Sequence, residues 1–469
     1  MADRSRATKL VCTLGPAVED RLDDLVAVGL DVARINLSHG TRETHERLLQ
    51  RVRKASAAAG RTVGVLVDLS GPKVRLGEVA EGRVGLAEGA RFELRPGGGP
   101  GDLRGAPTSH EGLADDLRVG DRVLLADGAA ELQVTGVDGD VVVTTVTSGG
   151  IVGSRSGINI PAERLSLPAI TARDERDIAW AREAGVDMVG QSFVRRPDDV
   201  LALRDLLGED APLVVAKVET GPAVRHAEGI IEAADGLMVA RGDLGVELPL
   251  EEIPLIQRDL VFRCVQAGKP VIVATQMLES MREAPRPTRA EASDVAGAVF
   301  DGADAIMLSA ETAVGAYPIE AARTAARIAE VAGGSGYVAA PPRLPAPTDA
   351  HLVAQAALSV SLQGGMTAIA CFTQSGMTAV LIAATRPRVP VYAFSPEVTV
   401  VRRLTLYRGV TPFLTDPLHD TDAMIATVDG RLQEGGFVRP GDAVLMVGSS
   451  PFGEANTNLL KIHRIGSSR

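Results

Sequence analysis

The segment Val214-Val-Ala-Lys-Val-Glu-Thr220 decides the fold, because a short apolar run ends there in a lysine and a carboxylate. A β-branched run of this length, bounded by polar residues, predicts a buried parallel strand. The chain holds eight runs of this kind: Leu10–Thr13, Val32–Asn36, Val63–Asp68, Met188–Phe193, Val214–Lys217, Leu237–Ala240, Val271–Thr275 and Ala305–Leu308. Helical patterns such as Thr44–Ala59 and Asp174–Ala184 lie between them. Eight alternating units predict an α/β fold built on a closed (β/α)8 TIM barrel; an open doubly wound sheet is the alternative.

Two stretches interrupt this rhythm. Between Glu78 and Val146, alternating Val and Leu with Gly-containing turns predict an inserted all-β unit that begins after Gly71-Pro72. The proline-rich composition of Ala339–Pro347 predicts a linker. Beyond it, four further strands alternate with helices: Ala368–Phe372, Val389–Phe394, Val410–Leu414 and Ala443–Val447. We therefore predict a barrel over residues 1–71 and 161–338, a β-rich lid domain over 72–160 and a C-terminal α/β domain over 348–469.

Composition narrows the class of protein. A chain of 469 residues, 45% of them apolar, is expected to fold as two or three domains with large cores. Its formal net charge of −11 argues against a general nucleic-acid binder, which needs a basic face. Three widely spaced cysteines give neither a disulfide framework nor a metal-ligand spacing. No apolar run approaches the roughly 20 residues of a membrane span, so a cytoplasmic protein without a membrane partner is expected.

Polar residues collect where the predicted barrel strands end, at the face where barrel enzymes place their sites. They are Arg34, Asn36, Ser38 and His39 after the second strand, Asp68 after the third, Lys217 and Glu219 after the fifth, Gly242 and Asp243 after the sixth, Thr275 after the seventh, and Ser309 and Glu311 after the eighth. We expect a phosphate-handling site there.

The chemistry of this set centres on Lys217, Glu219 and Asp243. Two carboxylates on neighbouring strand ends suit Mg²⁺, although Lys217 and Glu219 could also form a simple ion pair. Gly242 allows close approach of a ligand, and a helix starting just after Asp243 would point free N–H groups at an anion. Arg34 and Lys217 are candidates to stabilise a transferring phosphoryl group. There is no GK[ST] phosphate loop, so the chain is not a P-loop enzyme. Ser-His-Asp hydrolysis is unsupported, because Ser38 and His39 are sequence neighbours without a nucleophile elbow.

Five longer motifs resemble pyruvate kinases: Thr8–Pro16 (TKLVCTLGP), Arg34–Gly40 (RINLSHG), Met238–Glu247 (MVARGDLGVE), Ala274–Met281 (ATQMLESM) and Pro285–Ala292 (PRPTRAEA). The resemblance continues to Thr457-Asn458. It implies transfer of a phosphoryl group from phosphoenolpyruvate to ADP, with Mg²⁺ or Mn²⁺ as cofactor. It also implies a lid that closes over the nucleotide, a C-terminal regulatory domain and a homotetramer.

The same resemblance assigns roles to residues of this chain. Arg34 would bind the substrate phosphate, Lys217 would stabilise the transition state, and Glu219 and Asp243 would hold the divalent ion. The remaining assignments are substrate contacts by Gly242, Asp243 and Thr275, a proton-delivery network at Ser309 and Glu311, and nucleotide contacts by Asn36, His39, Arg75 and Arg155. Arg155 stands where the family often has lysine.

The segment Asp68-Leu-Ser-Gly-Pro-Lys-Val-Arg75 departs from the family members that require K⁺, which resemble DTKGPEIR. In those members, the equivalents of Asn36, Ser38 and Asp68, with a threonine carbonyl, hold the monovalent cation. Here Lys73 replaces the glutamate, so its ammonium could supply the charge that the other members recruit from K⁺. We therefore predict activity without K⁺; the alternative is a solvated hinge lysine.

A second loop, Thr373-Gln-Ser-Gly-Met-Thr378, follows a C-terminal strand and precedes a helix. Its candidate phosphate-binding residues are Thr373, Ser375, Gly376 and Thr378, because hydroxyls and amides at a helix start suit an anion. In the family such a loop receives a phosphorylated allosteric effector; an ordinary helix cap is the alternative. For the whole chain, an aldolase-like lyase on a related barrel and a non-catalytic metabolite sensor are the competing interpretations.

Overall fold

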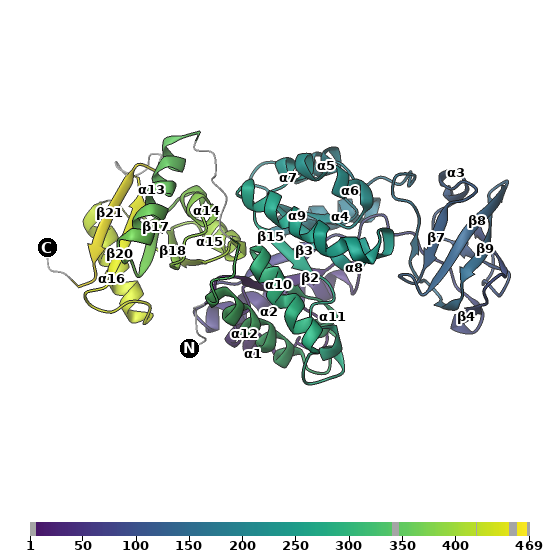
Figure 1. The fold of residues 1–469 in the computed structure, drawn as a ribbon, viewed down its shortest axis with the longest axis horizontal. Helices are drawn as coiled ribbons and strands as arrows, with labels where there is room; N and C mark the ends of the chain where they lie inside the picture. Colours follow the sequence, from purple (N-terminus) through teal and green to yellow (C-terminus); the bar gives the residue numbers. More distant parts are fainter. Residues whose placement is uncertain (1–5, 340–346, 419, 450–456, 467–469) are drawn as a thin grey trace.

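The computed structural model describes residues 6–339, 347–418, 420–449 and 457–466. Figure 1 shows a central barrel with helices around it, a β-rich unit at one end and a C-terminal α/β unit at the other. The predicted linker Ala339–Pro347 lies almost entirely outside the described residues.

The central unit is a closed parallel barrel, as predicted, and not an open sheet. Its strands are β1 Lys9–Thr13, β2 Val32–Asn36, β3 Gly64–Asp68, β12 Met188–Gln191, β13 Leu213–Val218, β14 Gly236–Ala240, β15 Val271–Ala274 and β16 Ala305–Leu308. They close in the order β1-β16-β15-β14-β13-β12-β3-β2. The surrounding helices are α1 Leu22–Ala27, α2 Arg42–Ala58, α4 Ala172–Glu183, α5 Pro197–Leu207, α6 Gly221–Arg225, α7 Ala227–Ala233, α8 Arg241–Glu247, α9 Ile253–Gln266, α10 Arg289–Asp301, α11 Ala310–Ala313 and α12 Pro318–Gly334, with 3-10 turns η2 Leu250–Glu252 and η3 Glu279–Arg282.

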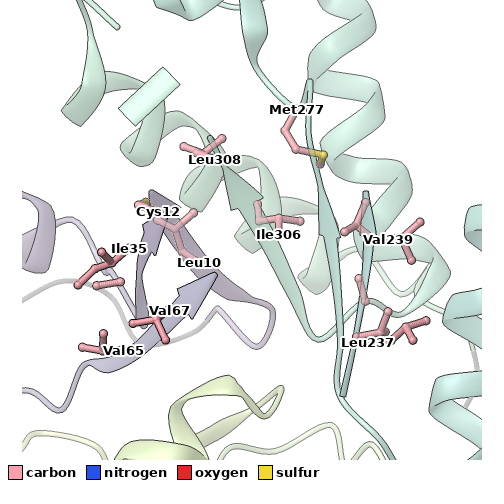
Figure 2. Packing of buried hydrophobic residues seen from close by; sticks show 14 of the residues in the cluster. Leu10, Cys12, Ile35, Val65, Val67, Leu237, Val239, Met277, Ile306 and Leu308 are labelled. Atoms are coloured by element: carbon pink, nitrogen blue, oxygen red, sulfur yellow. The ribbon is translucent and has the colours of Figure 1, made fainter. Parts of the chain in front are cut away.

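Alternating side chains of the barrel strands pack in opposite directions. Leu10 and Cys12 of β1 belong to the core between strands and helices, part of which is shown in Figure 2, whereas Val11 belongs to a second core. The alternation follows from the two-residue period of a strand. The second core continues into the C-terminal unit through residues such as Leu404 and Val410, so the barrel interior and that unit share one apolar cluster.

The lid is inserted between β3 and α4 and is all-β apart from two short turns of helix, η1 Ala80–Gly82 and α3 Leu113–Asp116. Its strands are β4 Arg83–Leu86, β5 Arg91–Pro96, β6 Gly105–Thr108, β7 Arg122–Leu125, β8 Ala130–Asp138, β9 Val141–Ser148, β10 Gly150–Gly153 and β11 Ile158–Asn159. Six strands form one sheet in the order β11-β7-β8-β9-β5-β6, and β10 pairs with β4. A separate core around Phe92 and Leu132 holds it together.

The C-terminal unit is a five-stranded sheet in the order β19-β18-β17-β20-β21. Its strands are β17 Ala368–Phe372, β18 Val391–Ser395, β19 Val410–Leu414, β20 Ala443–Gly448 and β21 Leu459–Arg464, and its helices are α13 Asp349–Gln363, α14 Met377–Ala384, α15 Val398–Arg403 and α16 Thr421–Glu434, with a 3-10 turn η4 Leu404–Leu406. The closing strand β21 runs antiparallel to β20.

Several strands end earlier or begin later than predicted, for local physical reasons. Phe193 and Thr275 were expected inside strands but have φ values of +56° and +68°, a left-handed conformation that ends an extended segment. Pro390 was expected inside β18, which begins at Val391, because proline has no N–H to donate to the sheet. Within the described part of the chain, none of the helices combines the length and the apolar character that a membrane crossing requires.

Candidate active site

Four side chains, from β2, β3 and the end of β13, meet at the carboxyl end of the barrel. Nζ of Lys217, on β13, lies 3.2 Å from Oδ1 of Asp68, at the end of β3, and 2.7 Å from Oε1 of Glu219. Arg34, on β2, donates from Nε to Oδ2 of Asp68 at 2.8 Å and forms an ion pair with the same oxygen. The extended backbone of β13 continues through Val218 to Glu219. Lys217 and Glu219 therefore lie on the same side of the strand, as expected.

These charges stabilise one another in a buried setting. Burial alone would lower the pKa of the Lys217 ammonium, but Asp68 and Glu219 outweigh burial and raise it. Burial alone would raise the pKa of Asp68, but Lys217 and Arg34 outweigh burial and lower it. Lys217 and Arg34 are only 7% and 8% exposed. The arrangement is therefore a pair of fixed cations held by a fixed anion at the mouth of the barrel.

Glu219 and Asp243 are the candidate metal ligands. Oε2 of Glu219 accepts a 2.8 Å hydrogen bond from the Phe193 amide. Burial raises the pKa of Glu219, the Lys217 ammonium lowers it, and the Asp243 carboxylate raises it further. A divalent cation would relieve the repulsion between these two carboxylates, so this donor set fits Mg²⁺. Among the described residues no group of three or more His, Cys, Asp or Glu is gathered so that it could hold a metal ion.

Gly242 and Thr275 contact each other across neighbouring strands. The Gly242 amide donates to Oγ1 of Thr275 at 2.7 Å, and that hydroxyl donates to the Ala274 carbonyl at 2.6 Å. The prediction that a helix starts just after Asp243 is wrong, because α8 begins at Arg241 and includes Asp243 in its first turn. One of its first amides is therefore satisfied by Thr275.

Ser309 and Glu311 follow β16 and form a local loop structure. Oε2 of Glu311 accepts from the Ser309 amide at 2.7 Å, and Oε1 accepts from the Leu278 amide at 3.1 Å. Glu311 is fully buried, and burial raises its pKa despite these hydrogen bonds. The carboxyl group thus ties the segment after β15 to the segment after β16.

Asn36, Ser38 and His39 lie in the loop after β2. Oδ1 of Asn36 accepts from the Ser38 amide at 3.0 Å. His39 is surrounded by cations: partial burial, followed by the charges of Arg75, Arg34, Lys73 and Arg173, lowers its pKa. The loop therefore lies in a positive field between the barrel and the start of the lid.

Lys73 and Arg155 contact residues of the lid. Nζ of Lys73 lies 3.6 Å from Oδ1 of Asp127, and Nε of Arg155 donates to Oε1 of Glu78 at 2.8 Å. Arg75 donates to the Arg155 carbonyl at 3.3 Å. The described contacts do not bring Arg155 to the Lys217 cluster, nor Lys73 to Asn36, Ser38 or Asp68.

The candidate effector loop lies in the C-terminal unit, before α14. Oγ1 of Thr373 accepts from the Gly376 amide at 2.9 Å, and Oγ of Ser375 accepts from the Met377 amide at 3.4 Å. Gly376 has φ +91°, and the hydroxyls of Thr378 and Thr457 are 2.7 Å apart. Part of this loop's hydrogen-bonding capacity is thus used within the loop.

Three residues of the site were not singled out from the sequence, although Thr13 lies within the motif Thr8–Pro16. Oγ of Ser192, after β12, accepts from Lys217 Nζ at 2.7 Å and donates to the Leu69 carbonyl at 2.7 Å. Oγ1 of Thr13, at the end of β1, accepts from Arg34 at 2.9 Å. A Cβ on Gly190 would lie 2.9 Å from Oδ1 of Asp68. For Thr13 and Ser192 the position at a strand end was the available clue, because neutral side chains do not stand out in a motif search.

Comparison with known proteins agrees with this geometry. The family model described as pyruvate kinase, barrel domain, matches residues 5–322, and the one described as pyruvate kinase, alpha/beta domain, matches residues 351–463. A pyruvate kinase of Mycobacterium tuberculosis is 45% identical over 98% of this chain and 99% of the relative. One from Geobacillus stearothermophilus is 41% identical over 98% of this chain and 80% of the relative.

A solved structure supports the same relationship. The crystal structure of a pyruvate kinase from Cryptosporidium parvum has a TM-score of 0.90 and 32% identity, and the match covers 98% of this chain and 96% of that one. These matches decide against the aldolase-like lyase and the metabolite sensor. The barrel, the inserted lid, the C-terminal unit and the matching families together show that this chain, a phosphotransferase, belongs to the pyruvate kinase family.

Proposed function

We propose that Arg34 and Lys217 neutralise the phosphoryl group as it moves from phosphoenolpyruvate to ADP. The reaction breaks the bond between phosphorus and the enol oxygen, forms a bond to a β-phosphate oxygen of ADP, and leaves an enolate that takes up a proton to give pyruvate. The observation that carries the proposal is the Lys217 ammonium, buried and held by Asp68, Glu219 and Ser192. Fixed cations in a dry site stabilise developing negative charge without reorganisation.

Replacing Lys217 by Met tests this role. Removal of one preorganised electrostatic contact lowers kcat by about 10²–10³-fold. The measurement is pyruvate formation coupled to lactate dehydrogenase, with folding checked by circular dichroism. Arg176→Met, on the exposed face of α4, is a control that should keep full activity. A folded Lys217→Met protein with normal kcat would contradict the assignment.

Glu219 and Asp243 are the residues that would hold Mg²⁺ or Mn²⁺. When bound, the ion supplies positive charge and orientation for substrate oxygens. Gly242 and Thr275 are then placed to contact the substrate. Their mutual hydrogen bond fixes the Thr275 hydroxyl, and the absence of a side chain on Gly242 leaves its backbone accessible.

Ser309 and Glu311 form the proposed proton-delivery network. Burial raises the pKa of Glu311, so this residue holds its proton more readily than a solvated glutamate does. Its contacts with the loops after β15 and β16 bring it to the same end of the barrel as Thr275. Ser309 lies two residues before Glu311, its amide donates to that carboxyl group, and its hydroxyl would pass a proton toward the enolate.

The nucleotide is proposed to bind in the positive field around His39. Arg75 and Lys73 contribute to that field from the hinge of the lid. Asn36 and His39 belong to the barrel, whereas Arg75 and Arg155 lie where the lid begins and ends, so closure of the lid would bring the two sets toward one ligand.

We propose that activity does not require K⁺. Three of the four groups that would hold the ion already have partners. Asp68 is paired with Arg34 and Lys217, and the Leu69 carbonyl accepts from Ser192. Oδ1 of Asn36 accepts from the Ser38 amide. The Lys73 ammonium adds a covalently attached positive charge to the same region, near His39.

An assay in tetramethylammonium buffer, with and without KCl, tests this proposal. The wild-type protein is expected to keep most of its activity without K⁺, whereas Lys73→Glu is expected to need the ion. Lys54→Glu, on the barrel helix α2, is the control for a simple change of charge. Loss of most wild-type activity without K⁺ would contradict the proposed independence from K⁺, but it would not affect the proposed role of Lys217.

The remaining proposals concern regulation and assembly. We infer that the protein is a cytoplasmic homotetramer whose loop Thr373–Thr378 receives a phosphorylated effector. The start of α14 and the hydroxyls beside it support the second point. Sedimentation of the purified protein tests the assembly. Titration of sugar phosphates and AMP at low phosphoenolpyruvate tests the loop, and no response to any of them would leave an ordinary helix cap.

A further inference from the structure

A buried histidine ties the loop after β2 to helix α2. Nε2 of His45, in the first turn of α2, lies 2.7 Å from the carbonyl oxygen of His39. A carbonyl oxygen can only accept, so this nitrogen carries the ring proton and donates it. His45 is 4% exposed, and its Nδ1 is buried without a hydrogen-bond partner among the described residues. Within the described part of the chain, the bond to His39 is therefore the one hydrogen bond that this ring makes.

Two helices hold the ring of His45 in place. It lies beside the buried ring of Trp180, on α4, with 6.1 Å between the ring centroids. The Arg42 guanidinium, from α2, lies 4.5 Å from the centroid of the Trp180 ring and forms an ion pair with Asp177 of α4. The donor nitrogen of His45 thus has a fixed position relative to the barrel.

The loop that His45 holds is otherwise anchored at its near end. The Leu37 amide donates to the Asp68 carbonyl at 3.0 Å, at the end of β3. Further along, the chain turns at Gly40, whose φ is +81°, and a Cβ there would lie 3.4 Å from Nε2 of His45. His45 therefore holds the far end of the loop, at the peptide that joins His39 to Gly40.

The side chain of His39 depends on that peptide for its direction. His39 is exposed, and its ring makes no hydrogen bond with any residue that the structure describes. A side chain without a partner of its own follows the orientation of its backbone. A donor that fixes the neighbouring carbonyl therefore preorganises the ring for a ligand.

We propose that His45 is a positioning residue for the nucleotide: by holding the His39 carbonyl, it keeps the His39 ring directed at ADP. This inference rests on the proposed nucleotide role of His39. His45 is buried and acts through His39 alone. No described contact joins His45 to Lys217 or Thr275, so its loss affects binding of the nucleotide and not of phosphoenolpyruvate.

Steady-state kinetics of the whole enzyme, with ADP and phosphoenolpyruvate varied in turn, test the proposal. His45→Phe keeps a ring and removes one hydrogen bond, so KM for ADP should rise about fivefold while kcat and KM for phosphoenolpyruvate stay within about twofold. His45→Gln has an amide nitrogen that can donate in place of Nε2 and should bring KM for ADP back to within about twofold of the wild type. His463→Phe removes a buried histidine hydrogen bond to Asp429 in the C-terminal unit and is the matched control.

The emission of Trp180, the single tryptophan of the chain, checks the packing beside the ring. An unchanged emission maximum in His45→Phe shows that α2 and α4 still meet as in the wild type. If that variant is misfolded, His45→Leu, with a smaller apolar side chain, takes its place with the same expected kinetics.

His39→Ala, alone and combined with His45→Phe, separates this inference from the proposed function. If His45 acts through His39, the double variant shows no further rise in KM for ADP over His39→Ala. A raised KM for ADP in His39→Ala but not in folded His45→Phe would overturn the positioning role alone. Additive effects in the double variant, or equal rises in both KM values, would show a merely structural histidine. A wild-type KM for ADP in His39→Ala would instead contradict the nucleotide role of His39, and the inference with it.

Discussion

Thr275 has a backbone conformation that a β-branched residue rarely adopts. Its φ is +68°, and that of Gln276 is +54°. Arg241 braces this turn: it donates to the Thr275 carbonyl at 2.7 Å and to the Ala274 carbonyl at 3.3 Å. Asp294 forms an ion pair with Arg241. Strain of this kind costs of order 1–3 kcal/mol per residue and persists only where neighbours enforce it. Arg241 is therefore a positioning residue for the Thr275 hydroxyl.

Replacing Arg241 by Lys should lower kcat/KM for phosphoenolpyruvate, because a lysine cannot hold two carbonyls and a carboxylate in one plane. A misplacement of about 1 Å at a reacting group lowers the rate about 10²-fold, so we expect kcat/KM to fall by up to about that factor. The measurement is steady-state kinetics of the folded variant. Arg258→Lys, which changes an exposed residue of α9 paired with Asp301, is the control. Unchanged kinetics in Arg241→Lys would show that the turn holds its shape without the brace.

Glu247 gives the structure a dependence on pH. Burial raises its pKa from 4.5 to about 7, with Glu163 and Glu219 adding to the effect; the Gly221 amide and Arg225 act against it. Between pH 4.5 and 7 the unfolded chain ionises this group while the folded protein keeps it protonated. The folded state therefore loses stability as pH rises through this window, and the loss is complete above about pH 7.

Glu247→Gln should remove that loss, because the amide oxygen can still accept from Gly221 and carries no charge. The melting temperature of the variant is expected to exceed that of the wild type by a margin that grows from pH 4.5 to 7 and then stays constant. Thermal melts in metal-free buffers across this range measure it. If the difference in melting temperature between the two proteins does not change with pH, Glu247 does not titrate in this range.

At this scale the sequence predicted charged groups better than neutral ones. Lys217 and Glu219 were expected on one side of a strand end, and their 2.7 Å contact has that geometry. Ser192 could not be predicted, because one hydroxyl after an apolar strand resembles any other until the barrel closes and brings it to Lys217. The chemical roles of all these residues stay predictions.

Helix α10 shows how one carboxylate can serve two elements. The side chain of Thr288 caps the helix by accepting from the Glu291 amide, and Glu291 bonds back to the Thr288 amide at 2.7 Å. The same Glu291 also accepts from the amide and the hydroxyl of Ser280, in η3. The start of α10 is thereby tied to the segment that follows Thr275.

Thr288→Ala should weaken the first turn of α10 by about 1 kcal/mol, the usual cost of losing an N-cap. Amide hydrogen exchange at Glu291 should speed up by about fivefold if local opening governs it. Thr171→Ala, at the equivalent capping box of α4, is a matched control that should affect α4 alone. Exchange at Glu291 that stays at the wild-type rate would mean that Ser280 and Glu291 hold the turn unaided.

The types of the elements followed from periodicity, whereas their ends depended on single residues. Ala305–Leu308 and Val410–Leu414 have the predicted bounds. The predicted end of the fourth barrel strand, at Phe193, was wrong because the left-handed φ there depends on what the following loop must contact, including Glu219. Periodicity carries no information about such a contact.

On the scale of the whole molecule, one buried carboxylate joins the barrel to the C-terminal unit. Asp304 precedes β16 and receives both terminal nitrogens of Arg386, at 2.9 and 2.6 Å. It also accepts from the Arg408 amide at 3.2 Å. Burial, with Arg386 next, lowers the pKa of Arg408 to about 10. Lys9 adds a hydrogen bond from β1 to the Val410 carbonyl at 2.6 Å.

Arg386→Gln should loosen this junction, because breaking a buried ion pair leaves an uncompensated charge and costs about 3–5 kcal/mol. Hydrogen exchange is expected to rise in both β16 and β19. Arg388→Gln, an exposed change two residues away, should leave both strands protected. Asp304→Asn combined with Arg386→Gln should recover part of the protection. Unaltered exchange in the single variant would show that the shared apolar cluster alone maintains the junction.

The sequence also predicted the architecture of the whole chain. The change from alternating βα units to an all-β texture after Gly71-Pro72 indicated the inserted lid, and the strands after Ala368 indicated a separate sheet. The exact domain boundaries stay predictions. A cavity of ≈ 760 Å³ between the barrel and the C-terminal unit could not be predicted from the sequence, because its wall combines residues of α2, α12 and α15 that are far apart in the chain.

The strand order of the barrel has a consequence for synthesis on the ribosome. β1 pairs with β2 and with β16, so one side of the first strand has no partner until Ala305–Leu308 has emerged. β3 likewise waits for β12 while the entire lid is translated. At about 5–20 residues per second, these open edges persist for many seconds, and unpaired edges are prone to aggregate. The lid, whose strands pair only with one another, can fold during that interval. Nascent chains that stall before residue 305 should therefore depend most on chaperones.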